Sequence, residues 1–395
     1  MNHEQKKICL IEAGIDLEKQ LSLYVHLPFC KQKCFYCDFN SYGDCSELIP
    51  DYCQALLIEF QRFLPQPFLI PTIYFGGGTP SVVPSESLAS LLLFLTQHFT
   101  VDRQAEITIE INPGTVTAND LFTLREAGFN RLSIGLQAVQ NRLLKEIGRI
   151  HTWEAFTEVY HQARVAGFTN INVDLISGLP GQSLADWQSS LTEVTALKPE
   201  HISAYSLQVE PGTPIAAMIE SGKQQLPDED EVVAMLQMTL DCLRQNGYEH
   251  YEISNYARKG FQSRHNLGYW LGRDYLGFGA GASSTYQQQR WINHEQPQEY
   301  IQNLQMGLSI IADLETIDPT QQITETLMLR LRMRDGIDLN KFASETGCDL
   351  QSQASTELQQ LRQASLITVV NNRLRLTDQG VFVSNLVIAE LLKTL

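Results

Sequence analysis

The sequence lacks the features of a membrane or secreted protein. It has no apolar run of the roughly 18 residues that a membrane-spanning helix needs. Residues 1–20 mix acidic and basic side chains and have no apolar core of the kind found in signal peptides. We therefore expect a soluble, cytoplasmic protein with no stable membrane insertion.

A disulfide framework is a second absence. Only three of the eight cysteines stand close together, spaced C-x3-C-x2-C. Without an export signal, scattered cysteines do not indicate paired disulfides. We interpret the remaining five as free thiols: Cys9, Cys45, Cys53, Cys242 and Cys348.

The chain also lacks basic charge. It has 29 Lys and Arg against 45 Asp and Glu, a net charge of −16, which opposes binding to phosphate backbones. Nucleic acid is not an expected partner. The 395 residues suffice for one large domain and a smaller one.

The cysteine triplet Cys30, Cys34 and Cys37 follows the apolar stretch 21–27. A loop that leaves a strand can turn three thiolates toward one inorganic centre. Structural zinc takes four ligands, and the next cysteine, Cys45, does not complete a paired framework, so zinc is the weaker interpretation. A [4Fe-4S] cluster usually takes four thiolates, so three leave one iron open to an exchangeable ligand. Three unrelated buried thiols are the remaining alternative.

The stretch YVHLPFC at 24–30, together with this triplet, resembles the radical S-adenosylmethionine (SAM) superfamily. It is most similar to the branch that contains the oxygen-independent coproporphyrinogen III dehydrogenases and the haem chaperone HemW. The resemblance implies that the three cysteines hold a [4Fe-4S] cluster and that the amino and carboxylate groups of SAM chelate the fourth iron.

Between residues 21 and 207, short β-rich runs alternate with longer helical patterns, which is typical of βα units around a parallel sheet. Strands are predicted at 21–27, 72–75, 106–111, 131–136, 170–176 and 201–207. Helices are predicted at 48–63, 85–98, 119–127, 153–166 and 184–196, two of them ending on the glycines Gly128 and Gly167. Six units fall short of a closed TIM barrel. We expect an α/β fold with a partial (β/α)6 TIM-like barrel, which the radical SAM resemblance also implies.

The chain is predicted to comprise an N-terminal segment (1–20), a radical SAM core (21–247), a connecting segment (248–316) and a C-terminal domain (317–395). The acidic run 228–231 indicates the solvated start of a helix over 232–243. Residues 248–281 read as loop-like. Three helices (324–333, 339–345, 357–364), a hairpin (366–370, 373–376) and a final helix from 380 predict a small winged-helix-like α+β domain. It has five basic against six acidic residues from 338 onward, so we expect packing or a lid, not DNA binding.

A glycine loop, GGGTP at 76–80, follows the second predicted strand. Glycines let a backbone approach a ligand closely, but a GGG loop alone is a weak signal because turns also use glycine. One βα unit after the cluster loop, it matches the motif with which radical SAM proteins hold the methionyl amino group. The resemblance implies contacts from Gly77, Gly78 and Thr79.

Four polar residues lie at or just after the ends of successive strands, where barrels place ligand groups: Glu110, Gln137, Arg149 and Asp174. A carboxylate can accept ribose hydroxyls or an amino group, and an arginine can bind the SAM carboxylate. Each one singly is more often a structural ion pair or hydrogen bond. Together they match, in order, the SAM-contacting positions of the coproporphyrinogen dehydrogenase family.

Two tyrosines match that family as well. The resemblance places Tyr24 near substrate or SAM, and Tyr36 beside the cluster near adenine. Two features depart from the dehydrogenases: Phe39 stands where they carry a further cysteine, and their long N-terminal extension is not found before Tyr24. Both departures are features of the HemW branch.

The segment RHNLGYW at 264–270 matches the H-N-x-x-Y-W motif of HemW proteins. Imidazole is a common haem ligand, and Tyr and Trp offer flat surfaces to a macrocycle. A histidine beside aromatics is more often a packed residue, and Asn266 is better explained as a turn former than as a ligand. With the resemblance, we expect His265 to contact haem.

The resemblance therefore implies a chaperone that binds haem and transfers it to acceptor haemoproteins, with a [4Fe-4S] cluster and SAM as cofactors. The alternative is an oxygen-independent coproporphyrinogen III dehydrogenase, against which Phe39 and the short N-terminal segment speak. A radical enzyme with another substrate has no positive support. If SAM is cleaved, an electron donor such as flavodoxin or ferredoxin is implied, and the resemblance also allows a homodimer.

Overall fold

The computed structural model describes residues 16–64 and 68–393, so Cys9 lies outside the described residues. All six predicted parallel strands are present as neighbours in one sheet, in the order β2-β3-β4-β5-β6-β7. Their bounds are β2 Ser22–Leu27, β3 Phe68–Gly77, β4 Thr100–Ile111, β5 Arg131–Gln137, β6 Ile171–Ser177 and β7 His201–Ser206. The partial α/β barrel is confirmed. β3 and β4 are several residues longer than the sequence indicated.

Side chains alternate along these strands, as the pleat of a β-strand requires. In β6 the apolar Val173 and Leu175 belong to the main core, whereas Asn172 and Asp174 line an inner cavity. The same alternation in β5 buries Leu132 against the helical layer. The barrel therefore has an apolar outer face under the helices and a polar inner face.

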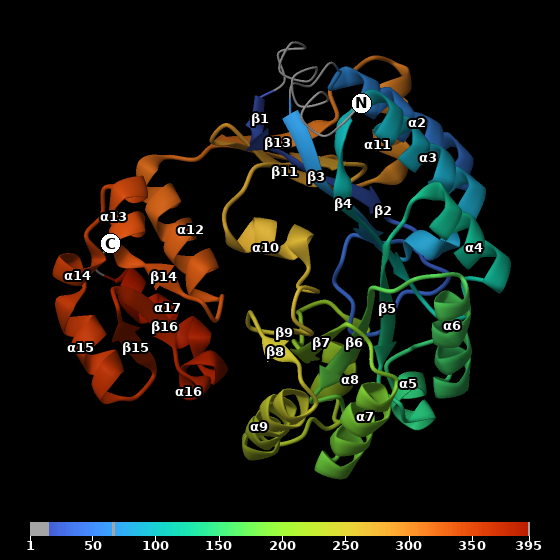
Figure 1. The fold of residues 1–395 in the computed structure, drawn as a ribbon. Coiled ribbons are helices and arrows are strands. Elements are labelled where there is room, and N and C mark those ends of the chain that lie inside the picture. The colour runs from blue at the N-terminus through green and yellow to red at the C-terminus, as the bar shows by residue number, and fades with distance from the viewer. Residues whose placement is uncertain (1–15, 65–67, 394–395) are drawn as a thin grey trace.

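The predicted helices cover the outer face of the barrel (Figure 1). They are α2 Ile49–Arg62, α3 Ser85–His98, α4 Ala118–Ala127, α6 Trp153–Val165 and α7 Leu184–Ala196. Helices α4 and α6 end just before Gly128 and Gly167. These glycines have φ of 115° and 92°, a left-handed conformation that glycine adopts without strain. The short helix α5 Asn141–Glu146 follows β5 and was not predicted.

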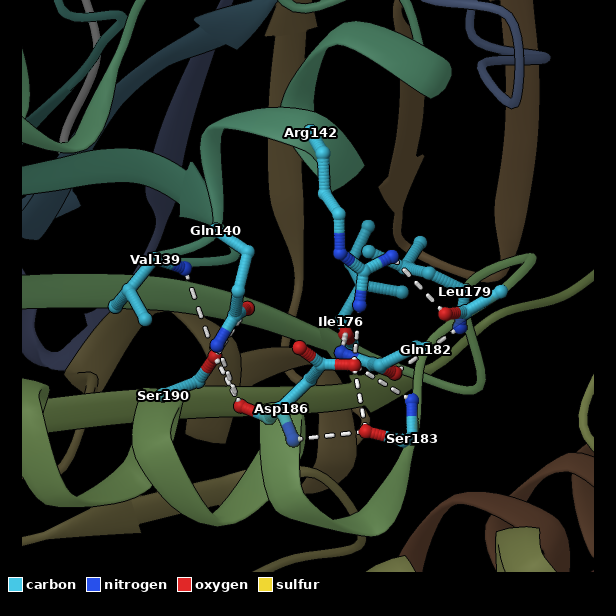
Figure 2. A network of polar contacts seen from close by, with 10 residues as sticks. Val139, Gln140, Arg142, Ile176, Leu179, Gln182, Ser183, Asp186 and Ser190 are labelled. Atoms are coloured by element: carbon cyan, nitrogen blue, oxygen red, sulfur yellow. Dashed lines mark hydrogen bonds and ion pairs between the residues drawn. The ribbon is translucent and has the colours of Figure 1, made fainter.

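A polar network ties the start of α5 to the start of α7 (Figure 2). Arg142 donates to the Asp186 carboxylate and to the Gly181 carbonyl oxygen, the latter at 3.1 Å. Asp186 also accepts from the hydroxyl of Ser183, the N-cap of α7, at 2.7 Å. Gln140 completes the connection through the Asp186 carbonyl at 2.8 Å. The network fixes the loop that leads from Gln137 toward Arg149.

The interpretation of residues 248–281 as loop-like is wrong. This stretch contains β8 Glu249–His250, β9 Asn255–Ala257, α10 Arg264–Trp270 and β10 Tyr275–Phe278. Strand β9 pairs antiparallel with β7, and β10 pairs parallel with β2, so the segment extends both edges of the barrel. Strands β11 Ser283–Tyr286, β12 Gln289–Asn293 and β13 Ile311–Thr316 continue beyond β10 to give a 13-stranded sheet within the described residues. Tertiary pairing overrides the glycine-rich composition here.

Between the barrel and the C-terminal domain lies α10, which contacts both β3 and α12 (Figure 1). The described residues also include β1 Asp16–Gln20 beside β3, helices α8 Pro214–Glu220 and α9 Glu229–Gln245, and α11 Pro297–Gln305, which packs on α2. Asp228 caps α9 by accepting from the Glu231 backbone N–H at 2.8 Å. The predicted helix start at the acidic run is confirmed.

The C-terminal domain has its own apolar core and a three-stranded antiparallel sheet in the order β14-β16-β15. Its elements are α12 Pro319–Leu331, β14 Ile337–Asp338, α13 Leu339–Thr346, α14 Leu350–Gln353, α15 Ser355–Gln363, β15 Ile367–Val370, β16 Arg373–Leu376, α16 Asp378–Phe382 and α17 Ser384–Leu392. The small α+β domain is confirmed. The single final helix expected from Gly380 is two short helices.

The structure bears on membrane-spanning helices and on disulfides. Across residues 16–64 and 68–393, no helix is both long and apolar enough to cross a membrane. Every cysteine in those ranges is free, including Cys45, Cys53, Cys242 and Cys348.

Candidate cluster and cofactor site

A cavity of about 520 Å³ lies at the carboxyl ends of the barrel strands. Its wall includes the cluster loop and the ends of β3, β4, β5 and β6, and its inner part is lined by polar side chains of the same strands. The volume falls within the range of small-molecule and cofactor sites. The described structure thus brings together most of the residues that the sequence singled out.

The three clustered thiols all line this cavity. The loop that carries them is held at its base, because the Cys30 N–H donates to Tyr42 O at 2.9 Å and the Tyr42 N–H donates to Pro28 O at 2.7 Å. Burial raises the pKa of Cys30 and of Cys37, so both favour the neutral thiol without a cationic partner. Such thiols become good ligands when a metal centre supplies the compensating charge.

The glycine loop is clamped directly onto the cluster loop. Backbone N–H groups of Gly78 and Thr79 donate to Leu27 O and Phe29 O at 2.9 and 2.7 Å. A Cβ added at Gly78 would lie 2.7 Å from Phe29 O and 2.9 Å from Cys30 Sγ. Only glycine leaves room for this approach. Gly77 adopts φ of 123° and a Cβ there would meet the His26 ring at 2.9 Å.

Arg149 connects the barrel to the cluster loop. Its Nη1 donates to Cys34 Sγ at 3.5 Å, and its Nη2 donates to Asn112 Oδ1 at 2.6 Å and to the Gly135 carbonyl oxygen. Its Nε is buried without a hydrogen-bond partner. The guanidinium therefore offers a hydrogen-bond donor to one cysteine of the cluster loop.

Gly135 and Gln137, at the end of β5, shape the space around this guanidinium. A Cβ on Gly135 would lie 2.7 Å from Asn112 Oδ1 and 2.9 Å from Arg149 Nη2. Gln137 is buried and has φ of 78°, which is uncommon for a residue other than glycine. Such backbone conformations gather at ligand sites, where the surrounding structure holds them in place.

The inner cavity holds two partly buried carboxyl groups, Glu110 and Asp174. Burial raises the pKa of Glu110 to about 7, and Tyr74 Oη donates to its Oε1 at 2.7 Å. Burial also raises the pKa of Asp174, which accepts from Asn172 Nδ2 at 2.7 Å. Both carboxyl groups line the cavity and can accept hydrogen bonds from hydroxyl or amino groups of a ligand.

Arg131 and Asn112 are site residues that the sequence analysis missed. Arg131 is 1 % exposed, lines the inner cavity, and has no ion pair with any residue of the described ranges. Its positive charge opposes the rise in pKa of Glu110 and Asp174. Asn112 donates to Thr79 Oγ1 at 2.8 Å and accepts from Arg149. It therefore links two residues that the sequence analysis expected to contact SAM. The sequence signal that could have identified such residues is a polar side chain at alternate positions of an otherwise apolar strand.

The two tyrosines lie in different places. Tyr36 lines the cavity beside the cluster loop, and burial raises its pKa. Tyr24 lies among aromatic rings behind the cavity, 6.2 Å from Tyr74 between centroids, with its hydroxyl 2.9 Å from His26 Nδ1. It is not among the residues that line the cavity.

His265 lies outside the barrel in sequence but packs against it in the fold. Its ring stacks on Tyr74 with a centroid separation of 5.0 Å. Nδ1 is 2.8 Å from Thr72 Oγ1 and Nε2 is 2.9 Å from Tyr269 Oη, so both ring nitrogens have protein partners. Burial lowers the pKa of His265 to about 3, which keeps the ring neutral. Iron ligation by this imidazole would require at least one of these hydrogen bonds to break.

The residues around the cavity fit a cluster with three protein ligands and a polar organic molecule. The cavity supplies three thiols, a guanidinium next to one of them, and partly buried carboxyl groups deeper inside. Across the described residues, no three His, Cys, Asp or Glu side chains are grouped closely enough to hold a single metal ion.

Comparisons with known proteins agree with this geometry. Residues 24–194 match the radical SAM superfamily, and residues 317–383 match the HemN C-terminal domain. The structure is similar to that of "Coproporphyrinogen III oxidase (HemN)" from Escherichia coli, with a TM-score of 0.84, 24% identity and coverage of 98% of this chain and 94% of that one. At that identity, the likeness shows the fold.

Sequence relatives are similar along most of their length. The chain is 35% identical to "Heme chaperone HemW" of Bacillus subtilis over 92% of this chain and 97% of the relative. It is 34% identical to the protein of the same name from Lactococcus lactis, over 93% and 96% respectively. The chain belongs to the HemW family of the radical SAM superfamily.

Proposed function

We propose that this protein is a haem chaperone that binds haem and passes it to acceptor haemoproteins. The observation that carries the proposal is the match to relatives named "Heme chaperone HemW" over almost the whole chain. The site agrees with it in one respect: Phe39 stands where the dehydrogenases carry a further cysteine, and its side chain is 65 % exposed at the cavity.

The cavity residues have separate roles in this proposal. Cys30, Cys34 and Cys37 hold the [4Fe-4S] cluster. The backbone of Gly77 and Gly78 and the hydroxyl of Thr79 contact the methionyl end of SAM, and Arg149 binds its carboxylate. The remaining contacts to the nucleoside come from Tyr36, Glu110, Gln137 and Asp174, all of which line the cavity.

When bound, the cluster supplies one electron for reductive cleavage of SAM, or holds SAM intact as a ligand. In both cases the chain's own residues shield the site, because the polar inner face and the glycine loop surround the ligand. An electron donor such as flavodoxin or ferredoxin is required only if SAM is cleaved. The proposed setting is the cytoplasm, and the proposed partners are haem and acceptor haemoproteins.

Anaerobic reconstitution followed by two separate titrations tests the proposal. Haem should bind stoichiometrically and change its Soret spectrum. With SAM and a reductant, coproporphyrinogen III should give no protoporphyrinogen. Formation of protoporphyrinogen at enzymatic rates would show that the protein is a dehydrogenase. Absence of haem binding would contradict the chaperone function.

A further inference from the structure

The end of the cluster loop is attached to a distant part of the chain through Asn40, which follows Cys37 by three residues. Its side-chain Nδ2 donates to Ala280 O at 3.1 Å and to Glu295 O at 3.2 Å. These carbonyl groups lie 240 and 255 residues further along the chain, beyond the residues 24–194 that match the radical SAM superfamily. The cluster loop therefore depends on a segment outside the six-stranded barrel.

Asn40 is the first residue after the third cysteine that fixes the loop by its side chain. Asp38 and Phe39 are exposed, and neither has a side-chain hydrogen bond to another described residue. The two bonds of Asn40 reach backbone carbonyl groups, which do not depend on the identity of the partner side chains. The position of Cys37 thus depends on these two bonds.

The turn 279–281 that receives the Asn40 side chain leaves no free space. A Cβ on Gly281 would lie 2.1 Å from Asn40 Nδ2, and a Cβ on Gly279 would lie 2.5 Å from His26 O. Both glycines have positive φ, of 73° and 104°, which other residues rarely adopt. Any larger residue at either position would push the turn away from the cluster loop.

Helix α2 holds this turn in place. The buried carboxyl group of Glu59 accepts from the Gly279 N–H at 2.8 Å. The buried Tyr52 hydroxyl accepts from the Ala280 N–H at 2.7 Å and donates to His26 O at 2.9 Å. Buried hydrogen bonds to the backbone restrain a turn strongly, because breaking them leaves polar groups unpaired. The turn therefore gives Asn40 a fixed point of attachment.

The backbone of Asn40 connects the same attachment to the glycine loop. Asn40 O lies 2.9 Å from His26 Nε2, and His26 Nδ1 lies 2.9 Å from Tyr24 Oη. Because a carbonyl oxygen only accepts, Nε2 carries the proton and Nδ1 accepts from the tyrosine. The His26 ring lies against Gly77, where an added Cβ would be 2.9 Å from Cε1. A shift of Asn40 would therefore also move a neighbour of the glycine loop.

We propose that Asn40 is a positioning residue, whose side chain holds the cluster loop so that Cys37 and the glycine loop face one SAM molecule in a single geometry. The inference rests on the cluster and SAM site of the proposed function and adds to it a residue with no ligand contact. Asn40 does not line the cavity, so it acts through Cys37 and His26. Preorganised contacts of this kind reduce the cost of ordering a site when the ligand binds.

Two variants of the full-length protein test the role of the side chain. Asn40→Ala removes both donors, and Asn40→Asp keeps the shape but turns an acceptor toward two carbonyl oxygens. After anaerobic reconstitution, iron and sulfide contents should stay near parent values because all three thiols remain. SAM affinity, measured by equilibrium dialysis, should fall roughly tenfold in both variants, as for the loss of two neutral hydrogen bonds. The electron paramagnetic resonance spectrum of the reduced, SAM-bound cluster should broaden because the loop occupies several positions.

A matched control loses a similar bond far from the cavity lining. Asn246 Nδ2 donates to Cys242 O at 2.8 Å at the end of α9. Neither residue lines the cavity at the cluster. Asn246→Ala should therefore bind SAM and give a cluster spectrum as the parent does.

Hydrogen–deuterium exchange in the cofactor-free protein provides an independent readout. The Tyr42 N–H, which donates to Pro28 O at 2.7 Å, should exchange several-fold faster in Asn40→Ala because the loop opens more often. The C-terminal domain, which has its own apolar core, should exchange at parent rates. Faster exchange throughout the chain would show general destabilisation and would overturn the inference.

The outcomes separate this inference from the proposed function. If the reconstituted parent binds no SAM, the cofactor site of the proposed function is wrong. If the parent binds SAM and both Asn40 variants bind it with the affinity and spectrum of the parent, the proposed function stands and the positioning role is overturned.

Discussion

The Arg149 guanidinium lies 3.5 Å from the Cys34 thiol, although 115 residues separate them in the chain. The same guanidinium reaches Asn112 at the end of β4 and Gly135 in β5. A single cation therefore links the cluster loop to two barrel strands. In the proposed holoprotein, it contacts both a cluster ligand and the SAM carboxylate, so cluster and cofactor binding share one residue.

The first prediction concerns this shared cation. In Arg149→Lys, the charge remains but the planar fork that reaches several acceptors is lost. We expect SAM binding to weaken by roughly 10- to 100-fold, the effect of removing a hydrogen bond between charged groups. Equilibrium dialysis with the reconstituted protein measures it. Arg244→Lys, in the exposed pair with Asp378, is the control and should leave SAM affinity unchanged. Parent-like SAM binding by Arg149→Lys would contradict the assignment.

The second prediction tests the space at Gly135. In Gly135→Ala the new methyl group would lie 2.7 Å from Asn112 Oδ1, so the Arg149 and Asn112 side chains must shift. SAM affinity should fall at least tenfold, since ligand contacts depend on both side chains. Gly43→Ala provides the control, because a Cβ there meets only ordinary contacts at 3.9 Å and beyond. Equal SAM affinity for the two variants would show that this close packing does not matter for the site.

The third prediction concerns pH. Because burial raises the pKa of Glu110 to about 7, the carboxyl is largely protonated in the free protein below that pH. The cationic groups of SAM favour the ionised carboxylate. SAM affinity should therefore increase as the pH rises, by at most about tenfold per pH unit, and become constant above about pH 7. The pKa of the Glu110 carboxyl also depends on its neighbours Tyr74, Asp174 and Arg131.

SAM titrations between roughly pH 5.5 and 7.5 check it. Glu110→Gln should flatten the dependence. Glu252 also has a pKa of about 7 through burial but lies away from the cavity lining, so Glu252→Gln should keep the slope. If only Glu252→Gln loses the pH dependence of SAM binding, Glu110 is not the group whose titration controls binding.

The fourth prediction separates two roles of His265. His265→Ala removes a buried ring together with its bonds to the hydroxyl groups of Thr72 and Tyr269, although Thr72 keeps its bond to Ser22 at 2.9 Å. We expect the free energy of unfolding to fall by about 2–4 kcal/mol. Because both ring nitrogens already bond to protein hydroxyl groups, the Soret position of bound haem should stay that of the parent. The exposed His161→Ala is the control for both measurements. A shifted Soret band in His265→Ala would identify the imidazole as an iron ligand after all.

The fifth prediction concerns the cluster ligands. Replacing Cys30, Cys34 or Cys37 by Ala should each remove most iron and sulfide after reconstitution, since all three line one cavity. Cys53→Ala, a buried free thiol on α2, should retain the full content. Comparable loss in the Cys53 variant would contradict the ligand assignment.

Much of the barrel was predictable because its signals are local. The strand at 131–136 and the helices at 85–98 and 184–196 follow from periodicity and capping residues, and the structure matches them within one residue. The cluster loop was predictable for the same reason, since three cysteines within eight residues leave few alternatives.

The remainder depends on contacts between distant segments. Strand β10 is recognisable only through its pairing with β2, where Gly277 lies opposite Tyr24. Arg131 was missed because a charged residue at the start of an apolar strand reads as a boundary, and only the fold shows that it lines the cavity. The contact between α10 and α12 was not predictable, because these helices are brought together by the fold alone.

The most direct test of a haem chaperone is the rate at which the haem-loaded protein delivers haem to an apo-haemoprotein, with apomyoglobin as acceptor. Stopped-flow absorbance records the appearance of the acceptor's Soret band at increasing acceptor concentration. The account predicts a rate that rises with acceptor concentration and exceeds the rate at which the protein releases haem to a small-molecule scavenger. A rate that equals spontaneous release and does not depend on acceptor concentration would show storage without transfer and would contradict the chaperone function.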